Sequence, residues 1–169
     1  ELVFLDITAT LEGRGPILDL IERAAAELTI PFTVGGGITD LEDARSLLRA
    51  GADKVSVNRA AFDNPSILTA LADEFGSQAV VCAIDAKAGE VFTHAGKTAR
   101  DRDAVDWGVE AVARGAGELL VQLARRGLRV GELRLQRADG QFVRRGVDAE
   151  QHVALLHRPV RLDRHLEHP

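Results

Sequence analysis

The sequence predicts an α/β fold in which parallel strands are joined by crossover helices. Strand and helix patterns alternate along residues 1–122 of the 169-residue chain, an order typical of βαβ units. The strand segments are apolar throughout rather than alternating, as expected for a sheet covered on both faces. Right-handed crossovers roll such a sheet either into a barrel or into an open doubly wound sheet, and the spacing of the elements does not distinguish the two.

Five principal strands are expected, and each is a short apolar run. Three of them lead directly into aspartate or glycine residues, which makes their ends candidate sites. A small extra strand is expected after the fourth one, at Val91–Thr93. The principal strands are Leu2–Leu5, Phe32–Val34, Lys54–Val57, Ala79–Ile84 and Leu119–Gln122.

Four helices are expected between these strands, because apolar residues recur there at helical spacing. Thr39 or Asp40 is a suitable N-cap for the second helix, and Pro65 suits the first turn of the third. Gly51 and Gly115 are stop signals. The predicted helices are Ile17–Leu28, Asp40–Ala50, Asn64–Phe75 and Asp103–Arg114.

Composition excludes several classes of function. A net charge of -5 argues against a nucleic-acid-binding surface, and no apolar run approaches the roughly 20 residues that span a membrane. Cys82 is the single cysteine, so a disulfide framework is impossible and a reducing cytoplasm is expected. It lies in an apolar run, where a buried hydrophobe is the simpler interpretation than a catalytic thiol. The chain opens at Glu1 inside an apolar run, and we expect sequence upstream of it.

Residues 123–169 form a second, divergent segment that is rich in arginine and histidine and contains no lysine. Val130–Leu135 and Gln141–Val143 flank an Asp-Gly pair, a strong hairpin signal, and Asp148–His157 is a candidate helix. His152 and His157 are five residues apart rather than the four of a helical metal pair, so no metal site is expected.

Three strand ends carry the residues that can perform chemistry, because sites in parallel β/α folds form at the carboxyl ends of the strands. Asp6 follows the first strand, and glycines 35–37 follow the second. Gly36 and Gly37 either let the backbone approach an anion or form a flexible turn. Asn58 is either an anion donor beside Arg59 or a simple N-cap. Together these residues predict a phosphate site.

Asp85 ends the most hydrophobic of the predicted strands. A carboxylate at that position is partly desolvated, which raises its pKa and suits a general acid or base. The alternative is a capping or loop aspartate. Lys87, two residues further on, either pairs with Asp85 or holds a phosphate.

The motifs resemble those of HisF, the cyclase subunit of imidazole glycerol phosphate synthase. The likeness is nearly continuous from residue 1 to about residue 121, and the sister isomerase HisA shares the glycine turn but is less similar elsewhere. The matching segments are ELVFLDITA at 1–9, IPFTVGGGI at 30–38, GADKVSVN at 51–58, NPSIL at 64–68, FGSQAVV at 75–81, AIDAK at 83–87 and RGAGELL at 114–120.

The resemblance implies part of a (β/α)8 TIM-type barrel with an irregular C-terminal tail, and a cyclase of histidine biosynthesis that needs no cofactor. Ammonia from a glutaminase partner attacks phosphoribulosyl-formimino aminoimidazole carboxamide ribonucleotide. The products are imidazole glycerol phosphate and aminoimidazole carboxamide ribonucleotide. Two aspartates act as acid and base in that family, and Asp85 matches the second of them.

The resemblance also assigns binding roles. Gly37 and Asn58 match one of two phosphate sites, and Asp6 matches a residue of the substrate pocket. A charged gate, where ammonia enters from the opposite face, matches Glu1, Lys54 and Glu118. Positions that face the glutaminase match Asp53 and Gln78.

The departures from the family concern both ends of the likeness. The family's first strand, with the other catalytic aspartate, a lysine and the gate's arginine, has no counterpart, and Leu123–Gly127 replaces a Ser-Leu-Asp-x-Asp-Gly motif. We therefore expect an incomplete chain. Three interpretations of its function stay open. The chain is a lyase subunit that is active when the missing strands complete it, a non-catalytic half-barrel remnant that binds phosphate, or a HisA-like isomerase. Open barrel edges predict a homodimer or an edge covered by Val130–Val143.

Overall fold

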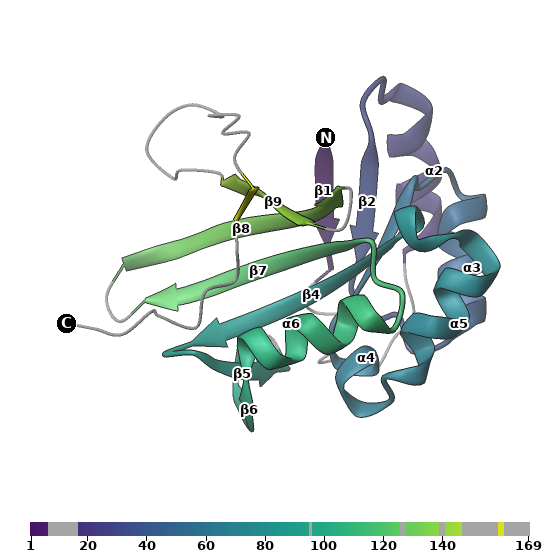
Figure 1. The fold of residues 1–169 in the computed structure, drawn as a ribbon. Coiled ribbons are helices and arrows are strands. Elements are labelled where there is room, and N and C mark those ends of the chain that lie inside the picture. Colours follow the sequence, from purple (N-terminus) through teal and green to yellow (C-terminus); the bar gives the residue numbers. More distant parts are fainter. Residues whose placement is uncertain (7–16, 95, 126–127, 139–140, 147–158, 161–169) are drawn as a thin grey trace.

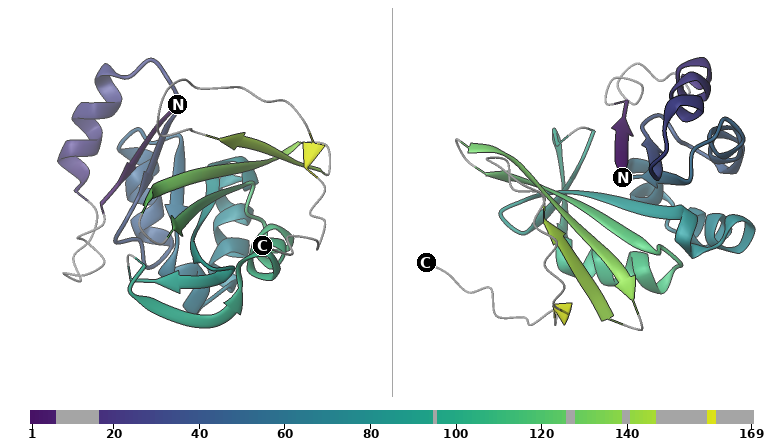
Figure 2. Two further views of the ribbon diagram at one scale, coloured as in Figure 1. Left: turned by 90° about the vertical axis from the view of Figure 1, so that its left-hand side faces the viewer. Right: turned by 90° about the horizontal axis from the view of Figure 1, so that it is seen from above.

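The structure, a computed structural model, describes residues 1–6, 17–94, 96–125, 128–138, 141–146 and 159–160. Within these residues ten strands form one curled sheet, and the helices lie along its outer face (Figures 1 and 2). The strand order along the sheet is β1-β2-β3-β4-β7-β8-β9-β10, with β5 and β6 as a side branch on β4.

Five parallel strands form the first part of the sheet, and they are adjacent in the order in which the chain visits them. This order, with a helical crossover between each pair, is that of a half-barrel, so the predicted fold class is confirmed. The parallel strands are β1 (Leu2–Leu5), β2 (Phe32–Gly35), β3 (Lys54–Val57), β4 (Val80–Lys87) and β7 (Glu118–Arg125).

The crossover helices follow the predicted apolar periodicity. Asp40, and not Thr39, is the N-cap of the second one, because its side chain accepts a hydrogen bond from Asp43 N at 3.0 Å. A helix was expected to begin at Asn58, but its range was not predicted, since five residues are too few to establish a helical period. The helices are α2 (Leu18–Glu27), α3 (Leu41–Arg49), α4 (Arg59–Asp63), α5 (Ser66–Phe75) and α6 (Ala104–Ala113), with a 3₁₀ turn at Ser77–Ala79.

The fourth strand is longer than predicted. β4 continues past Ile84 to Lys87, so Asp85 lies within the strand and does not end it. The cause is an antiparallel hairpin, β5 (Glu90–Thr93) and β6 (Thr98–Asp103), whose first strand pairs with this extension of β4. The sequence of β6 consists of small, acidic and basic residues, so no apolar pattern predicts this strand.

Antiparallel strands continue the sheet beyond β7. β8 (Leu128–Ala138) pairs with β7, β9 (Gln141–Gly146) pairs with β8, and β10 (Pro159–Val160) pairs with β9. The segment proposed for a hairpin therefore lies along the β7 edge. The predicted helix Asp148–His157 lies outside the described residues.

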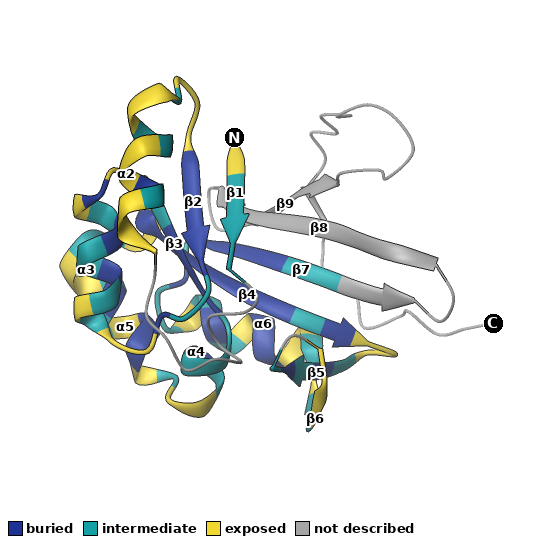
Figure 3. Ribbon diagram, turned by 180° about the vertical axis from the view of Figure 1, so that it is seen from behind, coloured by how far each residue is buried: buried dark blue, intermediate teal, exposed yellow. Residues whose placement is uncertain are grey.

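The core has two parts, one on each face of the sheet. The larger part lies between the sheet and the helices and contains fully buried Leu68 and Trp107 (Figure 3). Cys82 is buried in this part, as predicted. The inner face carries a smaller cluster of Val81, Ala83 and Leu120, against which residues of β1 pack. None of the helices in the described residues is long and apolar enough to cross a membrane.

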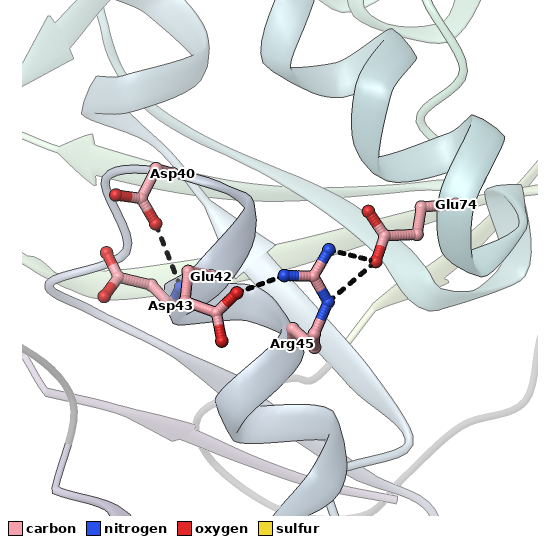
Figure 4. Close-up of polar contacts among 5 residues, drawn as sticks. All are labelled: Asp40, Glu42, Asp43, Arg45 and Glu74. Atoms are coloured by element: carbon pink, nitrogen blue, oxygen red, sulfur yellow. Dashed lines mark hydrogen bonds and ion pairs between the residues drawn. The ribbon is translucent and has the colours of Figure 1, made fainter.

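A surface ion cluster joins two neighbouring helices on the outside of the sheet. The Arg45 guanidinium on α3 donates to Glu74 Oε1 on α5 at 2.6 and 2.9 Å and also contacts Glu42 (Figure 4). These side chains are partly exposed, so the cluster contributes little to stability.

Candidate active site

Asp85 is the centre of the polar group at the carboxyl end of the parallel strands. Asp85 lies on β4, which is paired on both sides at this residue: its partners are Gln122 on β7 and Phe92 on β5. Asn58, which follows β3, donates from Nδ2 to Asp85 Oδ2 at 3.2 Å. The structure therefore brings together two residues that are 27 positions apart in the sequence.

Burial raises the pKa of the Asp85 carboxyl above its ordinary value. Hydrogen bonds from the Asn58 side chain and the Gly96 backbone act in the opposite direction. A carboxyl group in this balance can hold a proton nearer to neutral pH than an exposed aspartate does, and it can also release one. That property suits general acid–base chemistry.

Asn58 occupies the N-cap position of α4, but its side chain makes no capping hydrogen bond. The simple N-cap interpretation is therefore wrong for the side chain, which is directed to Asp85 instead. Arg59 is the first residue of the same helix and is partly buried.

The glycine turn after β2 is shaped by close backbone contact and is more than a flexible connection. Gly36 has φ +103°, and a Cβ there would lie 2.2 Å from Asp6 O. Gly37 also has a positive φ of 71°. Asp6 N donates to Gly35 O at 2.8 Å, so the ends of β1 and β2 are held together. This contact requires glycine and leaves the turn at the same end of the sheet as Asp85.

Lys87 is exposed at the end of β4, and its Nζ lies 5.8 Å from the centre of the Phe92 ring. The described residues include no ion pair between Lys87 and Asp85. Of the two roles considered for Lys87, pairing with Asp85 is therefore not present, and its ammonium group lies over the Phe92 ring of β5 instead.

A second polar group lies at the opposite, amino-terminal end of the strands. Lys54 Nζ lies 2.8 Å from Glu118 Oε2 and 3.2 Å from Glu1 Oε1. Thr33 Oγ1 donates to Glu1 Oε1 at 2.7 Å. Glu118 is buried, at 3% exposure, and the Glu1 side chain is only 13% exposed although its terminal backbone is open. The structure thus assembles the three predicted gate residues into one charged cluster.

Asp53 and Gln78 lie at the same end of the sheet but on its surface. Asp53 Oδ2 accepts from Phe32 N at 2.7 Å, and Gln78 Nε2 donates to Phe75 O at 3.1 Å. Both side chains are bonded to nearby backbone and both residues are exposed.

Two residues that face the interior of the half-barrel and one exposed residue of a hairpin turn were not predicted. Thr33 and Ser56 are buried hydroxyls that face inward, and only the period of two within a strand could have indicated them. Gly96 acts through its backbone, for which a sequence carries no signal. Among the described residues no three His, Cys, Asp or Glu side chains are grouped so that they could hold a metal ion.

Comparisons with known proteins show the family to which the sequence is related. The model of the family described as "Histidine biosynthesis protein" matches residues 1–132, which extends into the segment expected to diverge. The HisF subunit of imidazole glycerol phosphate synthase from Halalkalibacterium halodurans is 54% identical over 127 residues. Those from Geobacillus kaustophilus and Exiguobacterium sibiricum are 56% identical over 127 residues and 57% identical over 125. Each alignment covers 72% of this chain and 50% of the relative, so the chain spans about half the length of these relatives.

Proposed function

The chain belongs to the histidine biosynthesis protein family, and from this premise we propose that it carries one half of the cyclase site of imidazole glycerol phosphate synthase. The observation that carries the proposal is the Asn58–Asp85 hydrogen bond at the carboxyl end of a half-barrel. Relatives more than half identical to this chain bear the name of that synthase's HisF subunit. The substrate is the bisphosphate phosphoribulosyl-formimino aminoimidazole carboxamide ribonucleotide, and ammonia is the second reactant.

Asp85 is the acid–base group in this proposal. Burial raises the pKa of its carboxyl, which suits a group that donates a proton to a leaving or ring-closing nitrogen and then accepts one. The Asn58 amide donates a hydrogen bond to the charged form of Asp85 and so limits the rise of the Asp85 pKa. Backbone N–H groups of Gly36 and Gly37, with Asn58 and Arg59 nearby, are the proposed binding site for one of the two substrate phosphates.

The charged cluster of Glu1, Lys54 and Glu118 is the proposed entry point for ammonia. It lies at the end of the strands opposite Asp85, and the Lys54 ammonium lies within 3.2 Å of both carboxylates. The surface around Asp53 and Gln78 is the proposed docking face for a glutaminase subunit. The single buried cysteine is compatible with a cytoplasmic enzyme.

Ammonia-dependent formation of imidazole glycerol phosphate tests the proposal. Asp85→Asn is the test variant, and the exposed Asp73→Asn is the matched control. With the other half of the site supplied as a second chain, we expect turnover with the parent chain and with the control, and a loss of about 10²–10⁴-fold with the test variant.

Other outcomes separate the alternatives. No turnover from a folded chain that still binds the product favours a non-catalytic half-barrel remnant. Conversion of the isomerase substrate without ammonia favours a HisA-like isomerase. Equal activity of the parent chain and Asp85→Asn contradicts the role proposed for Asp85.

A further inference from the structure

The two hydrogen-bond donors to Asp85 come from different elements of the structure. Asn58 immediately precedes α4, and the Phe62 N–H of that helix donates to Asn58 O at 3.1 Å. Gly96 lies in the turn of the β5–β6 hairpin, where Lys97 N donates to Thr93 O at 3.1 Å. The geometry around the carboxyl therefore depends on how α4 and the hairpin are placed relative to each other.

One arginine of β6 joins the hairpin to α4. The Arg100 guanidinium lies over the Phe62 ring with Cζ 4.6 Å from the ring centre, and it also forms an ion pair with Asp63. Both contacts are to α4. A planar guanidinium can stack on a ring and bind a carboxylate at the same time, which a lysine ammonium does less well.

A second arginine of β6 fastens the same hairpin to α6. Arg102 lies 4.9 Å from the Trp107 ring centre and 6.0 Å from that of Phe62, and it forms an ion pair with Glu110. The Phe62 and Trp107 rings meet edge to face at 5.2 Å. The hairpin lies beside α6 (Figure 1), so α4, α6 and the hairpin form one packed group.

These contacts form a continuous ring of interacting residues that begins and ends at Asp85. It runs from the carboxyl through Asn58 to α4, across the Phe62 ring to β6, and back through Gly96 to the carboxyl. We propose that Arg100 is a positioning residue for Asp85. By joining the hairpin to α4, it fixes both hydrogen-bond donors around the carboxyl.

The inference rests on the acid–base role proposed for Asp85, but its test needs no turnover. The titration of the Asp85 side-chain carboxyl is followed by carbon NMR in the full chain, together with hydrogen exchange of the Gly96 amide. Arg100→Gln removes the contact. Arg45→Gln is the matched control, because Arg45 also joins two elements by an ion pair, but these are α3 and α5, neither of which supplies a hydrogen-bond donor to Asp85 (Figure 4).

Arg100→Gln is expected to raise the Asp85 midpoint by about half a pH unit, because both donors favour the charged form and both become less well aligned. Gly96 exchange is expected to become several-fold faster, while Arg45→Gln changes neither. An unchanged midpoint in folded Arg100→Gln, or an equal shift in Arg45→Gln, overturns the inference. If Arg100→Gln does not fold, Arg100→Lys replaces it, since it keeps the charge and loses the planar stacking. A smaller upward shift then supports the inference, and no shift overturns it. Failure of turnover, in contrast, contradicts only the proposed function.

Discussion

Replacing Lys54 by methionine removes the cation that holds two carboxylates together inside the amino-terminal end of the half-barrel. Glu118 is 3% exposed and lies 2.8 Å from Lys54 Nζ, so it loses this ion-pair partner. Breaking a buried ion pair on one side typically costs about 3–5 kcal/mol. The side chains of Lys54 and Glu1 retain 17% and 13% exposure, so we expect about 3 kcal/mol, at the low end of that range.

A double-mutant cycle separates this charge effect from lost packing. Glu118→Gln should destabilise less than Lys54→Met, because Glu1 remains 3.2 Å from the ammonium. The double variant should be more stable than the sum of the single effects predicts, with a coupling of about 1–2 kcal/mol. Urea unfolding followed by fluorescence of Trp107, the single tryptophan and a buried one, gives the free energies. Additive single effects, or a loss below about 1 kcal/mol for Lys54→Met, would refute the reasoning.

Three further predictions follow from burial and backbone conformation. Gly36→Ala should lower the free energy of unfolding by at least about 2 kcal/mol in thermal unfolding. The control Gly89→Ala is also at positive φ but has nothing within 4 Å of the new Cβ, so it should cost about 1 kcal/mol. Equal losses would contradict a clash between the new Cβ at position 36 and the backbone. Burial raises the pKa of the Cys82 thiol to about 12, so the thiol should resist a disulfide reagent at pH 8 until urea unfolds the chain. The contribution of the buried neutral thiol to the stability of the fold should be complete below about pH 9 and should be lost as the pH rises towards 12. Leu68→Ala in the core should cost about 3 kcal/mol, whereas Val109→Ala, 52% exposed on α6, should stay within about 0.5 kcal/mol.

The fold was predictable where one pattern extends over a whole element. The run at 79–84 and the helical spacing at Asp103–Arg114 correspond to β4 and α6 within one or two residues at most ends. The range of α4, which is shorter than two helical turns, was not predicted, and β6 was missed because its polar sequence has no apolar period. The extension of β4 past Asp85 could not be predicted because it depends on pairing with β5.

The candidate site was predictable only as residue types at strand ends. Parallel topology brings Asp85 and Asn58 to the same end of the sheet, and this was expected from their positions after strands. The direction of the Asn58 amide towards Asp85, and not towards the helix N–H groups, depends on side-chain geometry. The Lys87 contact with Phe92 depends on the hairpin in the same way.

Mapping product binding by NMR tests the central claim most directly. Imidazole glycerol phosphate is titrated into the full chain labelled with nitrogen-15, and backbone amide shifts are recorded. We expect the largest shifts at the carboxyl end of the strands, at Gly36, Gly37, Asn58 and Gly96, and we expect them to weaken in Asn58→Ala. Shifts centred on Lys54 and Glu118 at the opposite end, or no saturable shifts from a folded chain, would contradict it.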